Sequence, residues 1–568
     1  MNAPTWIRSL AQFAHTSQRR LAGTHLVLLA LVILAASGLF LSPDPSLFPM
    51  DDSYIHLVYA RNLADEGRLY FNAPDEQGVG TTSLLWVCLL AGGFKLGISG
   101  VVLSKALGAL SLFIICAAVY QLTHPISGRR IAFLAGLLIA LSGNMLWFAF
   151  SGMETTLFVA AALTALLAYR RKRWLLLGLL LGLMPLIRPE GILLFFTLAQ
   201  IELVRRRKFD RSMAKMILPG LLLALPWFVY LIVRTGHPLP TSGVGKQATT
   251  DLAISHVLHQ FPQLEFLKLF TPPIYVLSWI AYLLLFALGG MSLPGPVLPL
   301  SSLIGPLDYR YAWLALLVLA STVLPLLWPS LRRLVKGSNW RSWLADDNRR
   351  PFVILMVWIA FHNVVFALML PIPGTASRYG AINHLALWWA LALGFYFYRQ
   401  RGPRLKIAWL ALLALLASSN VIYWDQVYQA NQEHMRRVRI QAARYVAVTP
   451  EVEHCAAFDI GALRLFGHIH VIDIGGLIDP DLQAYYHAGE LDRYLWERGA
   501  DCLILPGRPG HAEEGWIDFL SVSGLGTSDL FDVSIMATFE IEHDRWMLGY
   551  LPTNNYQDSV VIYRIVRR

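Results

Sequence analysis

The sequence predicts a polytopic α-helical membrane protein that ends in a soluble α/β domain. Its composition is the first reason: of 568 residues, 56% are hydrophobic and only 15% charged, and the mean hydropathy is +0.50. Soluble domains carry about 25% charged residues. The other reasons are a series of long apolar stretches and a more polar composition after Trp424. We expect a transmembrane domain at 1–423 and a soluble domain at 424–568.

Apolar stretches recur throughout the first part, and a spanning helix needs about 20 such residues. They lie at 24–41, 101–121, 131–148, 153–169, 216–234, 273–289, 311–328, 352–370, 380–398 and 406–423, with shorter ones at 82–97, 174–187 and 191–204. We expect about 11 to 13 crossings. The count is open around 82–121, where 82–97 is short enough to be interfacial or re-entrant, and around 290–310, which Pro and Gly interrupt.

The first stretch, 24–41, follows Arg19 and Arg20 and could resemble a signal peptide. No small-residue cleavage pattern closes it before Pro43, so we interpret it as the first membrane helix. The first extracytoplasmic loop is then expected at 42–81.

Charge predicts which side each loop faces. The formal net charge is +10, but the basic residues are spread over short loops between apolar helices, so they indicate topology rather than nucleic-acid binding. Basic clusters, which mark the cytoplasmic side, lie at 170–173, 205–208, 332–336, 349–350 and 399–406. The alternate loops at 51–81, 151–154, 188–190, 235–272 and 371–380, and everything after about 424, are then expected outside.

The C-terminal domain shows alternating elements. We expect a helix at 425–448, strands at 454–458 and 469–474, a helix at 489–498, and strands at 501–505, 531–541 and 558–565. Cys455 and Cys502 stand beside predicted strands, so a disulfide between them is possible if this domain faces an oxidising compartment.

Two adjacent acids, Asp51 and Asp52, stand at the mouth of the first membrane helix. Adjacent carboxylates repel one another, so one of them often has a raised pKa, and that suits a general base. The plainer interpretation is a helix N-cap, a position that Asp favours. The dipeptide alone leaves both interpretations open.

Other expected outside turns also carry charge. Glu154, Arg188, Glu190, Lys246 and Arg378 lie in four such turns at helix ends. Ionisable residues at membrane depth are costly and usually line a cavity or pathway, and a guanidinium can hold a phosphate through two hydrogen bonds. An Arg188–Glu190 structural pair, or an Arg that reaches the lipid headgroups, would be the plainer alternative. All five residues are expected on the same side of the membrane, which favours the interpretation that they form one functional site.

The polar motifs of the outer loops resemble those of the mycobacterial terminal arabinofuranosyltransferase family, which belongs to the GT-C fold glycosyltransferases. The matching segments are 51–54, 61–64, Gly67 and 80–86, in the first loop and just after it, then 151–155, 188–191, 236–246, 459–461 and 473–477. The sequence departs from the family pattern at Val58, where the family has Arg, near Thr81, where it has Tyr, and at Leu84, where it has Pro. These departures leave the sugar and acceptor open.

The resemblance implies an inverting glycosyltransferase of the bacterial cytoplasmic membrane. Its donor would be a polyprenyl-phosphate sugar and its acceptor an envelope glycan or lipid, with membrane lipids around it. Asp51 would be the base and Asp52 would orient the acceptor or, less favoured, a metal, with no cofactor required. Arg188, Lys246 and Arg378 would hold the departing phosphate. Substrate contacts would come from Tyr54, Arg61, Asn62, Glu154, Glu190 and Tyr379.

Two rival functions stay open at this point. A transporter or flippase of lipid-linked sugars would also need ionisable residues within its bundle, although such proteins commonly show repeated halves, and none is visible here. A membrane scaffold whose C-terminal domain binds a partner would leave the acidic pair and Arg188 without a role.

Overall fold

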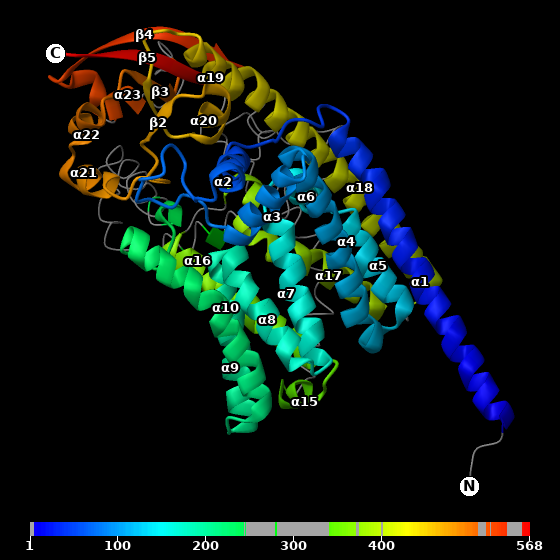
Figure 1. Cartoon of the computed structure of the whole chain (residues 1–568). Helices are drawn as coiled ribbons and strands as arrows, with labels where there is room; N and C mark the ends of the chain where they lie inside the picture. Colours follow the sequence, from blue (N-terminus) through cyan, green and yellow to red (C-terminus); the bar gives the residue numbers. More distant parts are fainter. Residues whose placement is uncertain are drawn as a thin grey trace, which may run out of the picture.

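The computed structural model describes residues 5–243, 340–370, 374–398, 402–508, 519–522, 524–541 and 559–568, together with residues 245, 276, 279 and 280. Within these ranges the chain forms a helical part and a C-terminal sheet that lies at one end of the helices (Figure 1).

The helical part follows the apolar pattern of the sequence closely. Its helices are α1 (Thr5–Leu41), α2 (Asp52–Glu66), α3 (Leu84–Lys95), α4 (Gly100–Ser127), α5 (Arg129–Ala140), α6 (Gly143–Phe150), α7 (Thr155–Arg170), α8 (Trp174–Ile187), α9 (Ile192–Arg206), α10 (Arg211–Thr235), α15 (Trp340–Ala345), α16 (Arg350–Met369), α17 (Ala381–Tyr398) and α18 (Pro403–His434). Two 3-10 helices, η1 (Pro189–Gly191) and η3 (Thr375–Gly380), precede α9 and α17. The predicted stretches at 273–289, 290–310 and 311–328 lie outside the described residues.

Several described helices have the length and apolarity of membrane spans. Five qualify, at Ala22–Leu41, Gly100–Ser127, Arg211–Thr235, Arg350–Met369 and Pro403–Ala447, where the last continues beyond α18. The stretch expected at 131–148 is not one straight helix, because α5 and α6 meet at a bend of 56°. Helix α3 has 12 residues, about 18 Å, which is too short to cross a bilayer. The predicted class of polytopic helical membrane protein is confirmed, while the total number of crossings stays a prediction.

Close helix packing explains some of the glycines. Where α8 crosses α10, a Cβ on Gly178 would lie 2.5 Å from the Met216 carbonyl oxygen, and one on Gly182 would lie 2.6 Å from that of Gly220. Small residues let helix backbones approach in this way, as in membrane helix pairs. The two helices can therefore pack along most of the length of α8.

The C-terminal domain is a five-stranded mixed sheet, as the alternating elements predicted. Its strands are β1 (His454–Ala457), β2 (His470–Asp473), β3 (Cys502–Pro506), β4 (Phe531–Glu540) and β5 (Ser559–Arg567), in the order β2-β1-β3-β5-β4. The first three are parallel, and β5 and β4 join them antiparallel. Its helices are α20 (Gly461–Gly467), α21 (Leu482–Ala488), α22 (Leu491–Arg498) and α23 (Phe519–Val522). Cys455 and Cys502 form a disulfide between neighbouring strands β1 and β3.

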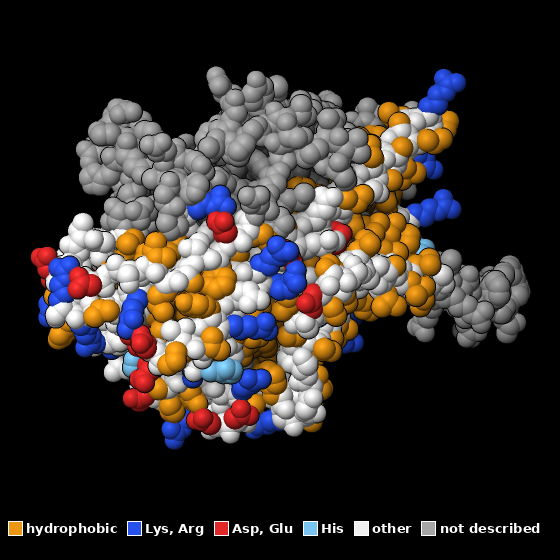
Figure 2. All heavy atoms as spheres, turned by 90° about the horizontal axis from the view of Figure 1, so that it is seen from above, with side chains coloured by type: hydrophobic (Ala, Val, Ile, Leu, Met, Phe, Trp, Pro, Cys, Tyr) orange, Lys and Arg blue, Asp and Glu red, His pale blue; other side chains and the backbone are white. Residues whose placement is uncertain are grey.

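Both faces of the sheet are covered. Alternate residues of β3 divide between two cores: Ile504 joins the core that includes α2, α3 and α20, and Leu503 joins the core of α21 and α22. This two-residue alternation is the expected geometry of a strand. The outer surface of the domain carries interspersed acidic and basic side chains (Figure 2). The C-terminal domain therefore has one outer surface exposed to solvent, beyond α21 and α22, and one surface packed against the helical part.

The first loop attaches the helical part to the sheet. The Asn72 side chain exchanges two hydrogen bonds with the backbone of Val471, at 2.9 and 3.0 Å. Arg464 of α20 donates to the carbonyl oxygens of Phe71 and Asn72. A Cβ on Gly78 would lie 1.5 Å from the Ile478 carbonyl oxygen, so the two backbones are in direct contact.

A continuous helical run also links the two parts. Helix α18 passes the predicted boundary at 423/424 and leads through a π-helical turn, Met435–Arg439, into α19 (Ile440–Ala447). The boundary therefore lies inside a helix, and the helix expected at 425–448 is the end of this run.

Candidate functional site

The two acids of the first loop point to different partners. Asp51 precedes α2, but its side chain makes no capping bond there. Instead, its Oδ2 accepts a hydrogen bond from the Gly461 amide and its Oδ1 accepts one from the Ala462 amide, both at 2.7 Å. Asp51 is only 8% exposed. The helix-cap interpretation therefore does not apply, because the carboxylate binds the C-terminal domain.

Asp52 forms an ion pair with Arg378. The Asp52 side chain is 24% exposed, whereas that of Arg378 is 4% exposed. Arg378 also donates to the Met50 sulfur at 3.5 Å, which holds it against the segment just before the acids. The acidic pair thus places one carboxylate toward the sheet and the other toward the turn before α17.

An unusual backbone presents Arg378. In η3, Ala376 and Ser377 have φ values of +56° and +61°, in the left-handed region. For residues with a side chain this conformation costs about 1–2 kcal/mol each. Left-handed non-glycine residues of this kind cluster at functional sites. The turn is held in this shape by its surroundings, and its position beside the acidic pair marks it as part of the site.

Arg188 is the centre of a buried charge network. It lies between α8 and η1, and its guanidinium contacts Glu154 at 3.0 Å and Glu190 at 2.5 Å. Glu154 also lies 3.3 Å from Nε2 of His56. The side chains of Arg188 and Glu154 are 7% and 1% exposed, respectively. Two carboxylates thus share the single positive charge of Arg188 in this arrangement.

Tyr379 joins the two arginines. The guanidinium carbons of Arg188 and Arg378 each lie 5.1 Å from the centre of its ring. Cations at this distance from an aromatic face are attracted by the ring quadrupole. The residues of four turns that are distant in the sequence therefore form one connected cluster: Asp52, Arg378, Tyr379, Arg188, Glu154, Glu190 and His56.

The surroundings shift two pKa values in opposite directions. Burial, the nearby Asp459 and Asp52 raise the pKa of Asp51 to about 7, against the opposing effect of its two amide hydrogen bonds. Burial would also raise the pKa of Glu154, but its hydrogen bond with His56 and the charge of Arg188 outweigh burial and lower the pKa to about 2. Asp51 is thus poised to exchange a proton near neutral pH, whereas Glu154 stays charged.

Three residues expected to contact substrate have other partners. The Tyr54 hydroxyl accepts from the Phe48 amide at 3.0 Å, and its ring packs inside the core. Asn62 donates to the Tyr70 carbonyl at 2.9 Å, and Arg61 lies exposed over the Phe94 ring. These three shape α2 and the first loop rather than the charged cluster. Lys246 lies outside the described residues.

Sequence reasoning missed two contributors. His56 lies one helical turn after Asp52, so the two share a face of α2. Asp459, just before α20, pairs with Arg439 at 2.7 Å. The motif at 459–461 was one signal for the second contributor, because it contains both Asp459 and the Gly461 amide that binds Asp51. Among the described residues, no group of three or more His, Cys, Asp or Glu side chains is placed to hold a metal ion.

Comparison with known proteins gives limited similarity. A family model described as a domain of unknown function (DUF8728) matches residues 423–552. No curated protein matches the chain. Among solved structures, apo oligosaccharyltransferase from Archaeoglobus fulgidus is 15% identical over 85% of this chain and 69% of that chain, with a TM-score of 0.49.

Two further structures contain a lipid phosphate. AglB from Archaeoglobus fulgidus, in complex with an inhibitory peptide and a dolichol-phosphate, is 14% identical over 86% of this chain and 69% of that chain, with a TM-score of 0.47. ArnT from Cupriavidus metallidurans bound to undecaprenyl phosphate is 14% identical over 94% of this chain and 97% of that chain, with a TM-score of 0.48. Because the TM-scores are below 0.5, the function is inferred from the site itself.

Proposed function

We propose that the chain is a membrane glycosyltransferase that moves a sugar, a pentose such as arabinofuranose or a hexose, from a polyprenyl-phosphate donor to an envelope glycan or lipid, with inversion. The observation that carries the proposal is that Asp52 binds Arg378, which shares the Tyr379 ring with Arg188, while the adjacent Asp51 is buried against the C-terminal domain. This reaction needs a base for the acceptor hydroxyl and fixed positive charge for the departing phosphate. The cluster supplies the positive charge, and Asp51, which is adjacent to Asp52 in the chain, is the proposed base.

In the proposed reaction, Asp51 takes the proton of the acceptor hydroxyl as the acceptor oxygen attacks the anomeric carbon. Its pKa of about 7 suits a base that works near neutral pH. The bond from the anomeric carbon to the phosphate oxygen breaks on the opposite face, so the configuration inverts. The polyprenyl phosphate leaves with the electron pair.

Arg378 is the proposed anchor of the departing phosphate, with Lys246 as a second cation. Arg378 is held by Asp52, whose side chain is partly exposed, and the departing phosphate is proposed to bind this guanidinium beside Asp52. Arg188 is proposed to act on the phosphate only indirectly, because its two carboxylate partners hold it against Tyr379. Asp52 is then the group that orients Arg378 and the acceptor.

The disulfide and the charge pattern support an outward-facing C-terminal domain. Disulfides persist in oxidising compartments such as the bacterial periplasm. Basic residues gather at the other end of the helices, where Lys172 and Arg350 share Asp347 at 2.6 and 2.9 Å. Such residues favour the cytoplasmic side. We propose the bacterial cytoplasmic membrane, with the site at its outer surface.

The test is transfer of radiolabelled sugar from a panel of polyprenyl-phosphate donors to a crude envelope acceptor by the purified chain. The wild type should transfer from at least one donor with or without EDTA, since no cofactor is proposed. Asp51→Asn should lose most turnover. No transfer from any donor, together with movement of a lipid-linked sugar across vesicles, would instead identify a flippase; neither activity would favour a scaffold.

Asp51→Asn also disturbs the contact with α20, since its amide nitrogen would face a backbone N–H donor. Gly461→Ala supplies the matched control. Its Cβ would lie 2.4 Å from the Asp51 carbonyl oxygen, so it disturbs the same contact but keeps the carboxylate. If Asp51 is the base, Gly461→Ala should retain much more transfer than Asp51→Asn does. Equal loss in both variants would assign Asp51 a docking role only.

A further inference from the structure

We propose that a groove between α4, α7 and α8 binds an anionic phospholipid of the membrane leaflet farther from the C-terminal domain. The groove has a volume of about 240 Å³ and is lined by residues at the turn between α7 and α8. This turn lies at the end of the helices away from the sheet (Figure 1). Neither the proposed reaction nor its residues involve the groove. The inference therefore stands independently of the proposed function.

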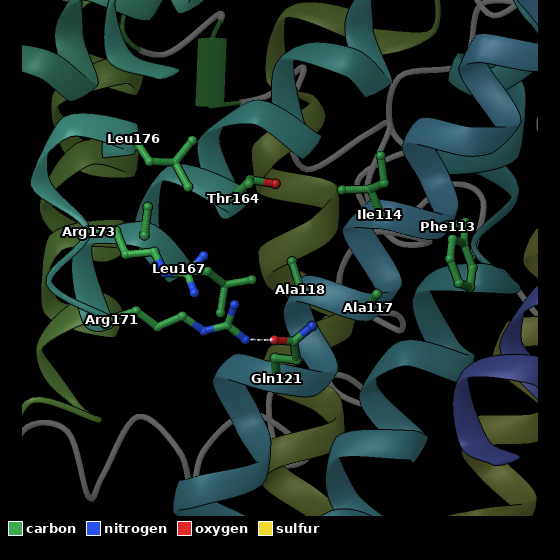
Figure 3. A pocket seen from close by; sticks show the side chains of 11 residues that line it. Phe113, Ile114, Ala117, Ala118, Gln121, Thr164, Leu167, Arg171, Arg173 and Leu176 are labelled. Carbon is green, nitrogen blue, oxygen red and sulfur yellow. Dashed lines mark hydrogen bonds between the residues drawn. The ribbon is translucent and has the colours of Figure 1, made fainter. Parts of the chain in front are cut away.

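The walls of the groove are mostly apolar. Phe113 and Ala117 of α4, Leu167 of α7 and Leu176 of α8 all line it (Figure 3). The nearby surface is also apolar, since Leu110, Leu175 and Leu176 are 53, 57 and 40% exposed. On a helix that contacts lipid, such exposure is expected. The groove therefore opens toward acyl chains rather than toward water.

One end of the groove is polar and positively charged. Arg171 donates a hydrogen bond to Oε1 of Gln121, and Arg173 reaches the groove beside it (Figure 3). Arg170 donates to the Gln121 carbonyl oxygen at 2.6 Å, which ties the α7–α8 turn to α4. This end supplies donors and positive charge at the position where a lipid headgroup would lie.

These two arginines differ from their basic neighbours. Lys172 is paired with Asp347, and both Arg205 and Arg206 are paired with Glu202. Among the residues that the structure describes, no carboxylate forms an ion pair with Arg171 or Arg173. Their charge is thus available to an external anion.

An anionic phospholipid matches both parts of the groove. Its phosphate would accept hydrogen bonds from Arg171 and Arg173, and the upper part of one chain would lie against Phe113 and Leu167. Phe113 lies eight residues before Gln121 on α4, a rise of about 12 Å, which is enough for the first carbons of an acyl chain. Basic pockets between membrane helices on the cytoplasmic side are suited to lipid headgroups of this charge.

Native mass spectrometry of the full chain in detergent, titrated with phosphatidylglycerol or phosphatidylcholine, tests the proposal. Phosphatidylglycerol should bind the wild type more tightly than phosphatidylcholine does. The double variant Arg171→Gln/Arg173→Gln should bind it about 30-fold more weakly, about fivefold for each basic residue. The control Arg207→Gln/Lys208→Gln removes the same charge from an exposed turn at the same end and should bind as the wild type does.

A second variant tests the groove without a change of charge. Ala117→Phe should fill part of the apolar wall and weaken phosphatidylglycerol binding, whereas Leu222→Phe, at a position that is 73% exposed on α10, should not. Three outcomes would overturn the proposal: equal affinity for the two lipids, equal weakening by both charge variants, or unchanged binding by Ala117→Phe in a chain whose thermal unfolding shows that it is folded.

Discussion

The Asp51 carboxylate lies 2.7 Å from the backbone amide of Gly461, a residue 410 positions later in the chain. This contact joins the proposed base to the first turn of α20, and Asn72 reinforces the joint by binding Val471. The C-terminal domain therefore contributes to the site by holding one of its carboxylates. A change in how the C-terminal domain docks should therefore change the rate of the reaction.

The first prediction concerns pH. The pKa of Asp51 is raised from 3.8 to about 7, so the base form should appear as pH rises through about 7. Sugar transfer by the wild type, measured from pH 5 to 9, should increase through that interval and then level off. A rate that is flat from pH 5 to 9 would contradict the role of Asp51.

The same pKa shift predicts the opposite trend in stability. Because the folded pKa exceeds the unfolded value, the folded chain holds a proton that the unfolded chain has lost between pH 3.8 and about 7. The contribution of Asp51 to stability is complete below this interval and falls as pH rises to about 7. Thermal unfolding of the wild type should show this fall, and Asp51→Asn should show a smaller one, because burial also raises the pKa of Asp473, to about 6. An equal fall in both proteins would assign the effect to other groups.

The second prediction tests the joint at α20. Gly461→Ala places a Cβ 2.4 Å from the Asp51 carbonyl oxygen and should destabilise the docked domain by about 1–3 kcal/mol, as overpacking does. Limited proteolysis should then cleave the first loop or the 448–454 segment faster than in the wild type. Gly526→Ala, whose Cβ would meet its nearest atom at 3.5 Å, is the control and should behave as the wild type. Equal protection in both variants would show that the joint is not needed for docking.

Several residues of this site could be predicted from the sequence, because charged residues are easily recognised in an otherwise apolar chain. Arg188 and Arg378 stand out between apolar stretches, and counting crossings from the basic clusters predicts that the two residues share one side of the membrane. The motif at 459–461 singled out this turn, but nothing in its sequence showed that the Gly461 amide would bind Asp51. For the same reason Tyr54 was expected at the substrate, although its hydroxyl satisfies the Phe48 amide inside the core. Sequence patterns predict the helices and strands, whereas long-range partners depend on packing.

The third prediction concerns the buried network. Arg188→Met removes the partner of Glu154 and Glu190 while keeping much of the side-chain length, and an uncompensated buried charge typically costs about 3–5 kcal/mol. The melting temperature should fall sharply, and adding Glu154→Gln should restore part of it. Arg493→Met is the matched control: Arg493 also contacts two carboxylates, but its side chain is 59% exposed, so the loss should be below about 1 kcal/mol. Similar losses in the two variants would mean that Arg188 is not a buried centre of charge.

The fourth prediction concerns the disulfide between Cys455 and Cys502. It joins β1 to β3 and closes a segment with a sequence separation of 47 that includes α20, so it restrains the unfolded domain around the residues that bind Asp51. Such a cross-link typically contributes about 2–4 kcal/mol. Reductant should therefore lower the unfolding temperature of the wild type but leave that of Cys455→Ala/Cys502→Ala unchanged. Cys88→Ala, which removes an exposed free cysteine, should respond to reductant as the wild type does. A wild type that is insensitive to reductant under unfolding conditions would show that the bond is absent or contributes nothing, and the argument from the disulfide for an oxidising compartment would then be lost.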